Sequence, residues 1–202
     1  MTTFQENQKA SSTDKILILK KIIGNGATRE CYQHPSFSDK CIKIVIKGKS
    51  DKILKRELKY YPIIKATLNN FIVKYDNKLI QTDKGIGLVC ELVKDENNKL
   101  SPSLLSYLKT HSIDKELESE LHYFTYQLIE HRLYFYDFNL KNFVVQQKNG
   151  KKHLKYIDLK SYENNKSWTF LKLEKIFPPL AELIMIRRLK RLYKTLGMNF
   201  FK

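Results

Sequence analysis

An aspartate and an asparagine five residues apart lie near the middle of the chain, between two apolar runs that are typical of strands. Asp137 can orient a hydroxyl group and accept its proton, and Asn142 can ligate a metal ion on the same side of the loop. Asp158 follows the next apolar run, sixteen positions after Asn142, as a second candidate metal ligand. These residues predict phosphoryl transfer to a hydroxyl group. The alternative is that the loop side chains only cap turns.

The first half of the chain holds residues that suit a nucleotide. Gly24 and Gly26 lie between two strand-like runs, where a backbone without Cβ atoms can fold over phosphates. Because this turn leads into a strand and not a helix, it does not fit the dinucleotide-binding pattern. Lys43 lies in a later β-branched run, and Glu57 on the predicted helix that follows is positioned to pair with it. An exposed lysine and a solvated glutamate are the alternatives.

Hydrophobic periodicity predicts an α+β fold in two lobes. We expect a flexible tail at residues 1–13, a strand-rich lobe with one helix at 14–93, and a helical lobe with a small hairpin at 94–202. Pro62 predicts a kink or a boundary in the first helix. The predicted strands cover 16–23, 30–34, 41–46, 71–80, 85–93, 143–147 and 154–157, and the predicted helices cover 50–66, 103–111, 116–131 and 180–196.

The composition of the chain indicates which classes of binding partner to expect. Of 202 residues, 37 are Lys or Arg and 21 are Asp or Glu, so the formal net charge is +16 and the surface attracts anions. A lysine-rich composition without functional meaning is an equal alternative. No zinc-finger, helix-turn-helix or RNA-recognition pattern occurs, so nucleic acid is not an expected partner. Three cysteines without metal spacing, no apolar leader and no long apolar run predict a cytoplasmic protein.

At this point the chain resembles a known family. The segments Ile23–Pro35, Cys41–Ile44, Tyr136–Asn142 and Tyr156–Asp158 are similar to those of the YrbL family of bacterial proteins (PhoP regulatory network proteins), a branch of the protein-kinase-like superfamily. The resemblance implies a compact, two-lobed protein-kinase-like fold with a truncated C-lobe. It also implies ATP between the lobes and Mg²⁺ beside its phosphates.

The resemblance implies a role for each candidate residue. These are Asp137 for catalysis, Asn142 and Asp158 for the metal, Lys43 for the phosphates beside the Gly24 and Gly26 turn, Glu57 as the partner of Lys43, and Glu91 and Val93, in the hinge Cys90–Val93, for adenine through the backbone. Arg29 departs from the family pattern, because it stands at the third glycine position of the turn, but its guanidinium could itself contact a phosphate.

Together with Arg29, three further departures from the kinase pattern leave two functions open. Phe135 stands where the catalytic loop usually has histidine, and Asn139 replaces the usual lysine. Asp158 is followed by Leu-Lys and not Phe-Gly. The protein is therefore expected to be either a Mg²⁺-dependent phosphotransferase or a catalytically inactive pseudokinase that serves as a regulatory binding module.

The acceptor is expected to be small. The stretch 159–202 after the second metal ligand is too short for both an activation segment and a peptide platform, which favours a sugar or glycolipid hydroxyl over a protein substrate. The basic run Arg187–Lys194 lies on a predicted amphipathic helix. The charged face of this helix predicts peripheral contact with an anionic inner membrane face. The alternative is that this face is only a solvated helix surface.

Overall fold

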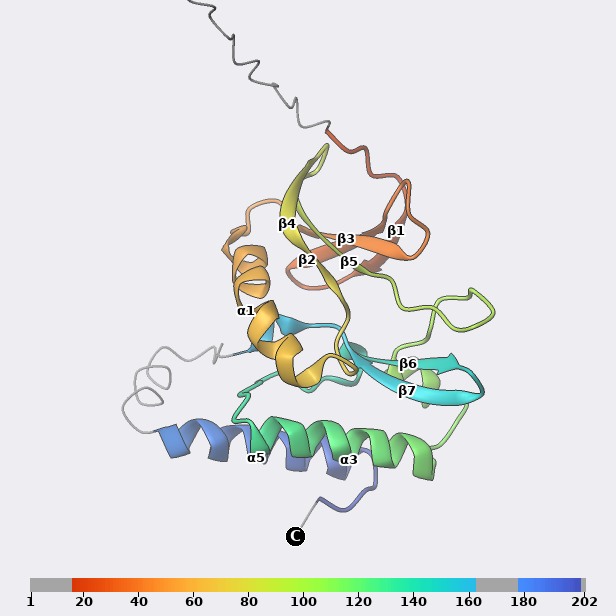
Figure 1. Ribbon diagram of the computed structural model, residues 1–202, viewed down its shortest axis with the longest axis vertical. Helices are drawn as coiled ribbons and strands as arrows, with labels where there is room; N and C mark the ends of the chain where they lie inside the picture. Colours follow the sequence, from red (N-terminus) through yellow and green to blue (C-terminus); the bar gives the residue numbers. More distant parts are fainter. Residues whose placement is uncertain (1–15, 163–177, 201–202) are drawn as a thin grey trace, which may run out of the picture.

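An antiparallel sheet of five strands forms one end of the molecule, and two long helices lie at the other end (Figure 1). The computed structural model describes residues 16–162 and 178–200. The predicted tail at 1–13 lies outside the described residues. The strands are β1 (Ile22–Asn25), β2 (Arg29–Gln33), β3 (Lys40–Val45), β4 (Tyr75–Thr82) and β5 (Gly85–Glu91), in the sheet order β1-β2-β3-β5-β4.

Alternation along β3 decides which side chains face the rest of the protein. Ile42 and Ile44 join a small apolar cluster on one face of the sheet. Cys41 belongs to the main core on the opposite face, and Lys43 is buried between neighbouring strands with the same orientation as Cys41. The period of two therefore turns a lysine toward the inside of the protein.

Helix α1 (Lys52–Leu68) covers the inner side of the sheet and carries one charged residue on its buried face. Its buried positions follow helical spacing: Leu54, Glu57, Tyr61, Ile64 and Leu68. The helix continues through Pro62, so the predicted boundary there is wrong. Pro62 is exposed, and on the solvent side water can replace the backbone hydrogen bond that proline removes.

The second lobe packs a hairpin against helices. Its elements are α2 (Leu104–Tyr107), α3 (Lys115–Glu130), the 3-10 turn η1 (Leu140–Asn142), β6 (Phe143–Lys148), β7 (Lys151–Tyr156), the 3-10 turn η2 (Leu159–Ser161) and α5 (Pro178–Thr195). Asn149 and Gly150 close the hairpin with φ of 54° and 69°, as a two-residue hairpin turn requires. The hydroxyl oxygen of Tyr193 on α5 lies within hydrogen-bond distance of Leu121 O (3.3 Å) and Thr125 Oγ1 (3.0 Å) on α3.

Four predicted elements differ from the structure by more than two residues at one end. Among them, β4 begins at Tyr75 and not at residue 71, and β7 begins at Lys151 and not at residue 154. The start of the strand predicted at 16–23 does not bond to β2. The N–H groups of Leu17 and Leu19 donate instead to Gln81 O and to the Asp83 side chain beside the β4–β5 turn, and bonding to β2 begins at Lys21, whose carbonyl accepts the Gln33 N–H. The predicted helix at 103–111 is a single turn. After Tyr107 the N–H groups of Lys109 and Thr110 bond three residues back, to Ser106 O and Tyr107 O, so the chain tightens into turns.

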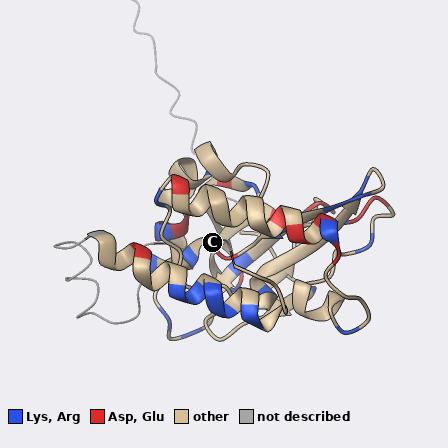
Figure 2. Ribbon diagram, turned by 90° about the horizontal axis from the view of Figure 1, so that it is seen from below, with Lys and Arg blue, Asp and Glu red and all other residues tan. Residues whose placement is uncertain are grey.

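Charge is distributed unevenly over the two long helices. Figure 2 shows Lys and Arg gathered along the C-terminal part of α5, while the acidic residues of α3 beside it are all glutamates. Among the described residues, no helix is long and apolar enough to span a bilayer.

Candidate functional site

Lys43 and Glu57 meet inside the first lobe, as predicted from their order in the sequence. Lys43 Nζ lies 3.4 Å from Glu57 Oε2 and donates to Tyr75 Oη and to Ile157 O, both at 2.7 Å. Only 8% of Lys43 and 1% of Glu57 is exposed, so neither is the solvated residue of the alternative interpretation. The Tyr75 hydroxyl donates to Glu57 Oε2 (2.6 Å) and completes the cluster.

Arg29 joins this cluster from β2. Its guanidinium donates to Glu57 and, at 2.6 Å, to Asp158 Oδ1. The predicted contact of Arg29 with a phosphate stays a prediction, since two carboxylates hold the side chain in this structure. Arg29 thereby links the sheet, helix α1 and the segment that follows β7.

Asp158, a predicted metal ligand, has cations at both carboxylate oxygens. Arg29 Nη2 approaches Oδ1, and Lys160 Nζ lies 3.0 Å from Oδ2. The backbone N–H of Lys160 also donates to Oδ1 at 3.3 Å. A metal ion that binds the Asp158 carboxylate would therefore have to displace at least one of these two side chains.

Burial and charge act in opposite directions on these groups. Burial would lower the pKa of Lys43, but the charges of Glu57, Cys90 and Asp158 together outweigh it, so the pKa is raised. Burial would also lower the pKa of Arg29, but the carboxylates of Glu57 and Asp158 raise it. Burial would raise the pKa of Asp158, whereas Arg29, Lys160 and Lys43 lower it. All three groups are thus charged at neutral pH.

The Asp137 loop (residues 136–142) is fixed mainly through its backbone. The Tyr156 hydroxyl donates to Asp137 O at 2.6 Å, and Asn142 Nδ2 approaches the same oxygen at 3.4 Å. Ile157 N–H donates to Asn142 O at 2.8 Å, which joins this loop to the segment that carries Asp158. The Asp137 carboxylate accepts only the long contact from Asn139 N–H (3.3 Å) among the described residues, so it is available to a ligand.

Phe135, at the position where the kinase catalytic loop usually has histidine, packs inside the protein. Its side chain is fully buried, and its ring centroid lies 5.3 Å from that of Tyr156 and 5.2 Å from that of Tyr162. Tyr156 in turn holds the Asp137 loop. Phe135 therefore supports this loop through aromatic packing.

One cavity brings most of the predicted residues together. Its volume is about 760 Å³, and it lies between the Gly24–Arg29 turn and the Asp137 loop. Among its lining residues are Gly24, Gly26, Arg29, Lys43, Asp137, Asn142 and Asp158. Lys141 and Lys160 line it as well and increase its positive charge.

A narrower, apolar cavity of about 200 Å³ continues from the first and shares Gly24 and Lys43 with it. The hinge residue Val93 lines it, and the Val93 N–H donates no hydrogen bond within residues 16–162 and 178–200. Its remaining walls are mostly apolar: Ile23, Val73, Leu92, Leu100, Val144 and Ile157, with the free thiols of Cys31, Cys41 and Cys90. A flat apolar group with one acceptor atom facing Val93 fits this shape.

The two glycines of the turn are not required by the protein itself. Neither has a positive φ. A Cβ added at Gly24 would lie 3.7 Å from Cys31 Cβ, and one at Gly26 would lie 3.4 Å from Arg29 O. The fold therefore has room for a side chain at Gly24, and the absence of one leaves this part of the cavity open.

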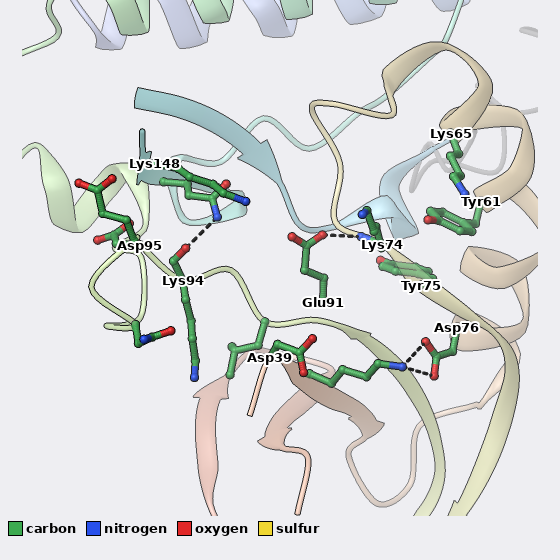
Figure 3. Close-up of a pocket in the computed structure, with 15 residues that line it drawn as sticks. Asp39, Tyr61, Lys65, Lys74, Tyr75, Asp76, Glu91, Lys94, Asp95 and Lys148 are labelled. Carbon is green, nitrogen blue, oxygen red and sulfur yellow. Dashed lines mark hydrogen bonds and ion pairs between the residues drawn. The ribbon is translucent and has the colours of Figure 1, made fainter. Parts of the chain in front are cut away.

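Glu91 lines the narrow cavity and also a third cavity, of about 650 Å³, where its side chain points toward Lys74 (Figure 3). Its carboxylate accepts the Lys74 N–H at 3.0 Å, and its N–H donates to Lys74 O at 2.7 Å. The side chain therefore secures the hinge against the start of β4. Any contact of Glu91 with a nucleotide would involve its backbone, as the resemblance implies.

Three residues of the site were not selected from the sequence. Tyr75 bridges Lys43 and Glu57, Lys160 holds Asp158, and Lys141 lies in the cavity wall next to Asn142. Lys141 and Lys160 could have been found from their positions, one inside the Asp-Asn segment and one two residues after Asp158. No sequence motif near Tyr75 indicates that it belongs to the site.

The oxygen donors suit Mg²⁺ with a nucleotide present. In the described parts of the chain, no group of three or more His, Cys, Asp or Glu side chains could hold a metal ion alone. Asn142 and Asp158 offer an amide and a carboxylate oxygen in one cavity. Mg²⁺ is commonly held by one or two such groups together with substrate phosphates, so the donor set fits.

Known proteins resemble this chain in sequence and in fold. A family model described as PhoP regulatory network protein YrbL matches residues 16–197. The uncharacterized protein YrbL of Escherichia coli (strain K12) is 37% identical over 89 residues, as is that of Shigella flexneri; the match covers 42% of this chain and 42% of each relative. The aligned part is thus less than half the length of these curated relatives.

The fold matches solved kinase domains. Two double mutants of the Mycobacterium tuberculosis PknI kinase domain superpose with a TM-score of 0.50 at 14% identity, over 70% of this chain and 57% and 59% of the kinase domains. The predicted two-lobed, protein-kinase-like fold with a short C-lobe is therefore confirmed. Because the family model covers most of the sequence, the chain belongs to the YrbL family, as the resemblance of its motifs indicated.

Proposed function

We propose that this protein binds ATP between its lobes and transfers the terminal phosphoryl group to a hydroxyl group of a small molecule. One observation carries the proposal. Lys43, Asp137, Asn142 and Asp158, which are distant in sequence, line a single cavity. A lysine, two oxygen donors for a metal and a free carboxylate are the groups that phosphoryl transfer requires.

The neighbouring apolar cavity suits the adenine ring. Val93 N–H offers a hydrogen bond to a ring nitrogen, and the apolar walls enclose the ring faces. The phosphates would then extend toward Gly24 and Lys43, which line both cavities. Lys43 neutralises phosphate charge from a position fixed by Glu57 and Tyr75.

The remaining residues position the reacting groups. Asp137 orients the acceptor hydroxyl and takes its proton. Mg²⁺, held by Asn142 and Asp158, would supply further neutralisation of the phosphate charge. The formal charge of +16 favours a negatively charged, small acceptor over a neutral one.

A thermal-shift experiment tests nucleotide binding. The melting temperature is measured with ATP, with and without Mg²⁺, for the wild type and for Asp158→Ala. A ligand that binds only the folded state raises stability by about 2.7 kcal/mol at a hundredfold excess over its Kd. We expect a Mg²⁺-dependent rise in the wild type that Asp158→Ala removes. No rise with any nucleotide would contradict the proposal.

One observation favours a second function, a catalytically inactive binding module. Both oxygens of Asp158 are already neutralised by Arg29 and Lys160, which could take the place of a metal. Steady-state ATP consumption separates the two functions. A phosphotransferase loses turnover in Asp137→Ala while it still binds ATP, whereas a binding module shows no turnover in either protein.

A further inference from the structure

A cavity of about 520 Å³ lies on the α5 side of the Asp137 loop. Asp137, Asn139 and Lys141 line both this cavity and the one proposed for the phosphates. The Asp137 loop is therefore a wall shared by two cavities. A molecule bound on the α5 side can present an atom to Asp137 while ATP occupies the other side.

The walls of this α5 cavity are strongly positive. Lys141, Arg188 and Arg191 line it, and Asp137 is the single acidic side chain among its lining residues. Arg188 and Arg191 are three residues apart on α5 and so share one face of the helix. This face belongs to the basic part of α5 in Figure 2. Apolar side chains complete the walls: Leu105, Phe138, Leu140 and Leu192.

The two arginines have different environments. Arg188 donates to Tyr136 O, and its guanidinium lies 5.3 Å from the centroid of the Tyr136 ring, so it anchors α5 to the Asp137 loop. Arg191 is exposed, and no carboxylate pairs with it in the described parts of the chain. Its guanidinium is available to an anionic group, and Arg binds phosphate in a bidentate geometry.

We propose that the α5 cavity is the acceptor site and that its acceptor already carries a phosphate group. This inference rests on the proposed phosphotransferase function. The phosphate of the acceptor binds Arg191 and Lys141, and a hydroxyl group of the same molecule faces Asp137. The acceptor is a free phosphorylated molecule, such as a sugar phosphate, or the phosphate-bearing head group of a lipid. The cavity volume lies in the range of small-molecule sites, about 300–1,000 Å³.

The reaction balances without a further reactant. The acceptor oxygen forms a bond to the γ-phosphorus of ATP as the bond from that phosphorus to the β,γ-bridging oxygen breaks. ADP leaves with the electron pair of the broken bond. The hydroxyl proton passes to the Asp137 carboxylate and then to solvent. The products are ADP, a proton and an acceptor with two phosphate groups.

The test compares anionic ligands with their neutral counterparts on the full chain. Calorimetric titrations use glucose 6-phosphate against glucose and glycerol 3-phosphate against glycerol. Sedimentation uses phosphatidylglycerol vesicles against phosphatidylcholine vesicles, which separates a lipid source from a free one. The variant is Arg191→Gln, and the control is Lys194→Gln, which removes the same charge from an exposed position of α5 outside the cavity. ATP is titrated in parallel.

We expect at least one phosphorylated ligand, free or in vesicles, to bind the wild type while its neutral counterpart does not. Its affinity should fall about tenfold in Arg191→Gln and stay unchanged in Lys194→Gln. The inference is overturned if no phosphorylated ligand binds, or if both variants lose affinity equally. Intact ATP binding in such a case would leave the proposed function standing, whereas failure of the wild type to bind ATP would remove that function instead.

Discussion

Arg29 and Asp158 form an ion pair of 2.6 Å although 129 residues separate them in the sequence. Because Arg29 also pairs with Glu57, one guanidinium neutralises two buried carboxylates. The pair connects the sheet of the first lobe to the segment that follows the hairpin of the second. It therefore helps to hold the two lobes together beside the proposed nucleotide site.

Replacing Arg29 by methionine should destabilise the protein. Two buried carboxylates would lose a partner, and breaking a buried ion pair typically costs about 3–5 kcal/mol. The matched control is Lys40→Met, since Lys40 pairs with Asp76 where both side chains are partly exposed. Such a pair contributes at most about 1 kcal/mol. Urea denaturation measures both variants, and equal losses would show that the buried network does not stabilise the fold.

Gly24→Ala should separate ligand binding from stability. The added methyl group would meet Cys31 Cβ at an ordinary 3.7 Å, so the free energy of unfolding should change by less than about 0.5 kcal/mol. ATP affinity should fall, because the methyl group enters the space where the backbone would approach the phosphates. Gly87→Ala is the contrasting variant. Its Cβ would lie 2.6 Å from Ile42 Cγ2, and neither residue lines the cavity, so the variant should lower stability while the folded protein keeps its ATP affinity. Unchanged ATP affinity in Gly24→Ala would argue against a phosphate site at this turn.

Restoring histidine at Phe135 should not increase activity. An imidazole would be buried among the rings of Tyr156 and Tyr162 without a defined hydrogen-bond partner, at a cost of about 1–3 kcal/mol. Phe135→Leu keeps the site apolar and is the control for lost ring contacts. Thermal melts and ATP consumption measure the outcome. A Phe135→His protein that is as stable as the wild type and more active would contradict the structural role of Phe135.

The acid stability of the protein should depend on Asp114, which caps helix α3. Its carboxylate accepts the Leu117 N–H at 3.0 Å and pairs with Lys152, and both contacts lower the pKa of Asp114 from its usual 3.8. A carboxyl group with a lowered pKa in the folded state stabilises the fold above its usual pKa. This stabilisation is lost as the pH falls through the folded-state pKa.

Asp114→Ala should therefore cost about 1 kcal/mol at pH 7 and less at acidic pH. Asp114→Asn keeps a capping oxygen without the charge and should lose less at pH 7. Urea denaturation at neutral pH and below the usual pKa of 3.8 measures the difference between each variant and the wild type. A cost of Asp114→Ala that is independent of pH would show that the charge of the cap has no role.

Much of the site could be predicted because local patterns determine it. Strand alternation places Lys43 on the inner face, and the order of motifs brings Asp137, Asn142 and Asp158 to one cavity. Glu57 was the least certain of these residues from its type alone, since helix glutamates usually face solvent. Its spacing, three residues after Leu54 and four before Tyr61, was the better guide to its burial.

Other features depend on contacts that local spacing does not encode. The two carboxylate partners of Arg29 lie 28 and 129 residues away, so the sequence around Arg29 suggested a phosphate instead. The segment near Leu17 has the composition of a strand, yet it bonds to the β4–β5 turn and not to β2. Pro62 lies on the solvent side of α1, a position that becomes clear only when the buried face is known.

The central claim is that ATP binds in the cavity that contains Lys43, and calorimetric titration tests it most directly. ATP is titrated into the wild type, Lys43→Met and the partly exposed control Lys40→Met, after circular dichroism has confirmed that each is folded. We predict that Lys43→Met raises the Kd at least about tenfold, through loss of a charge-assisted contact to phosphate, and that Lys40→Met binds like the wild type. Equal affinity in the wild type and Lys43→Met, or no binding to the wild type, would contradict the claim.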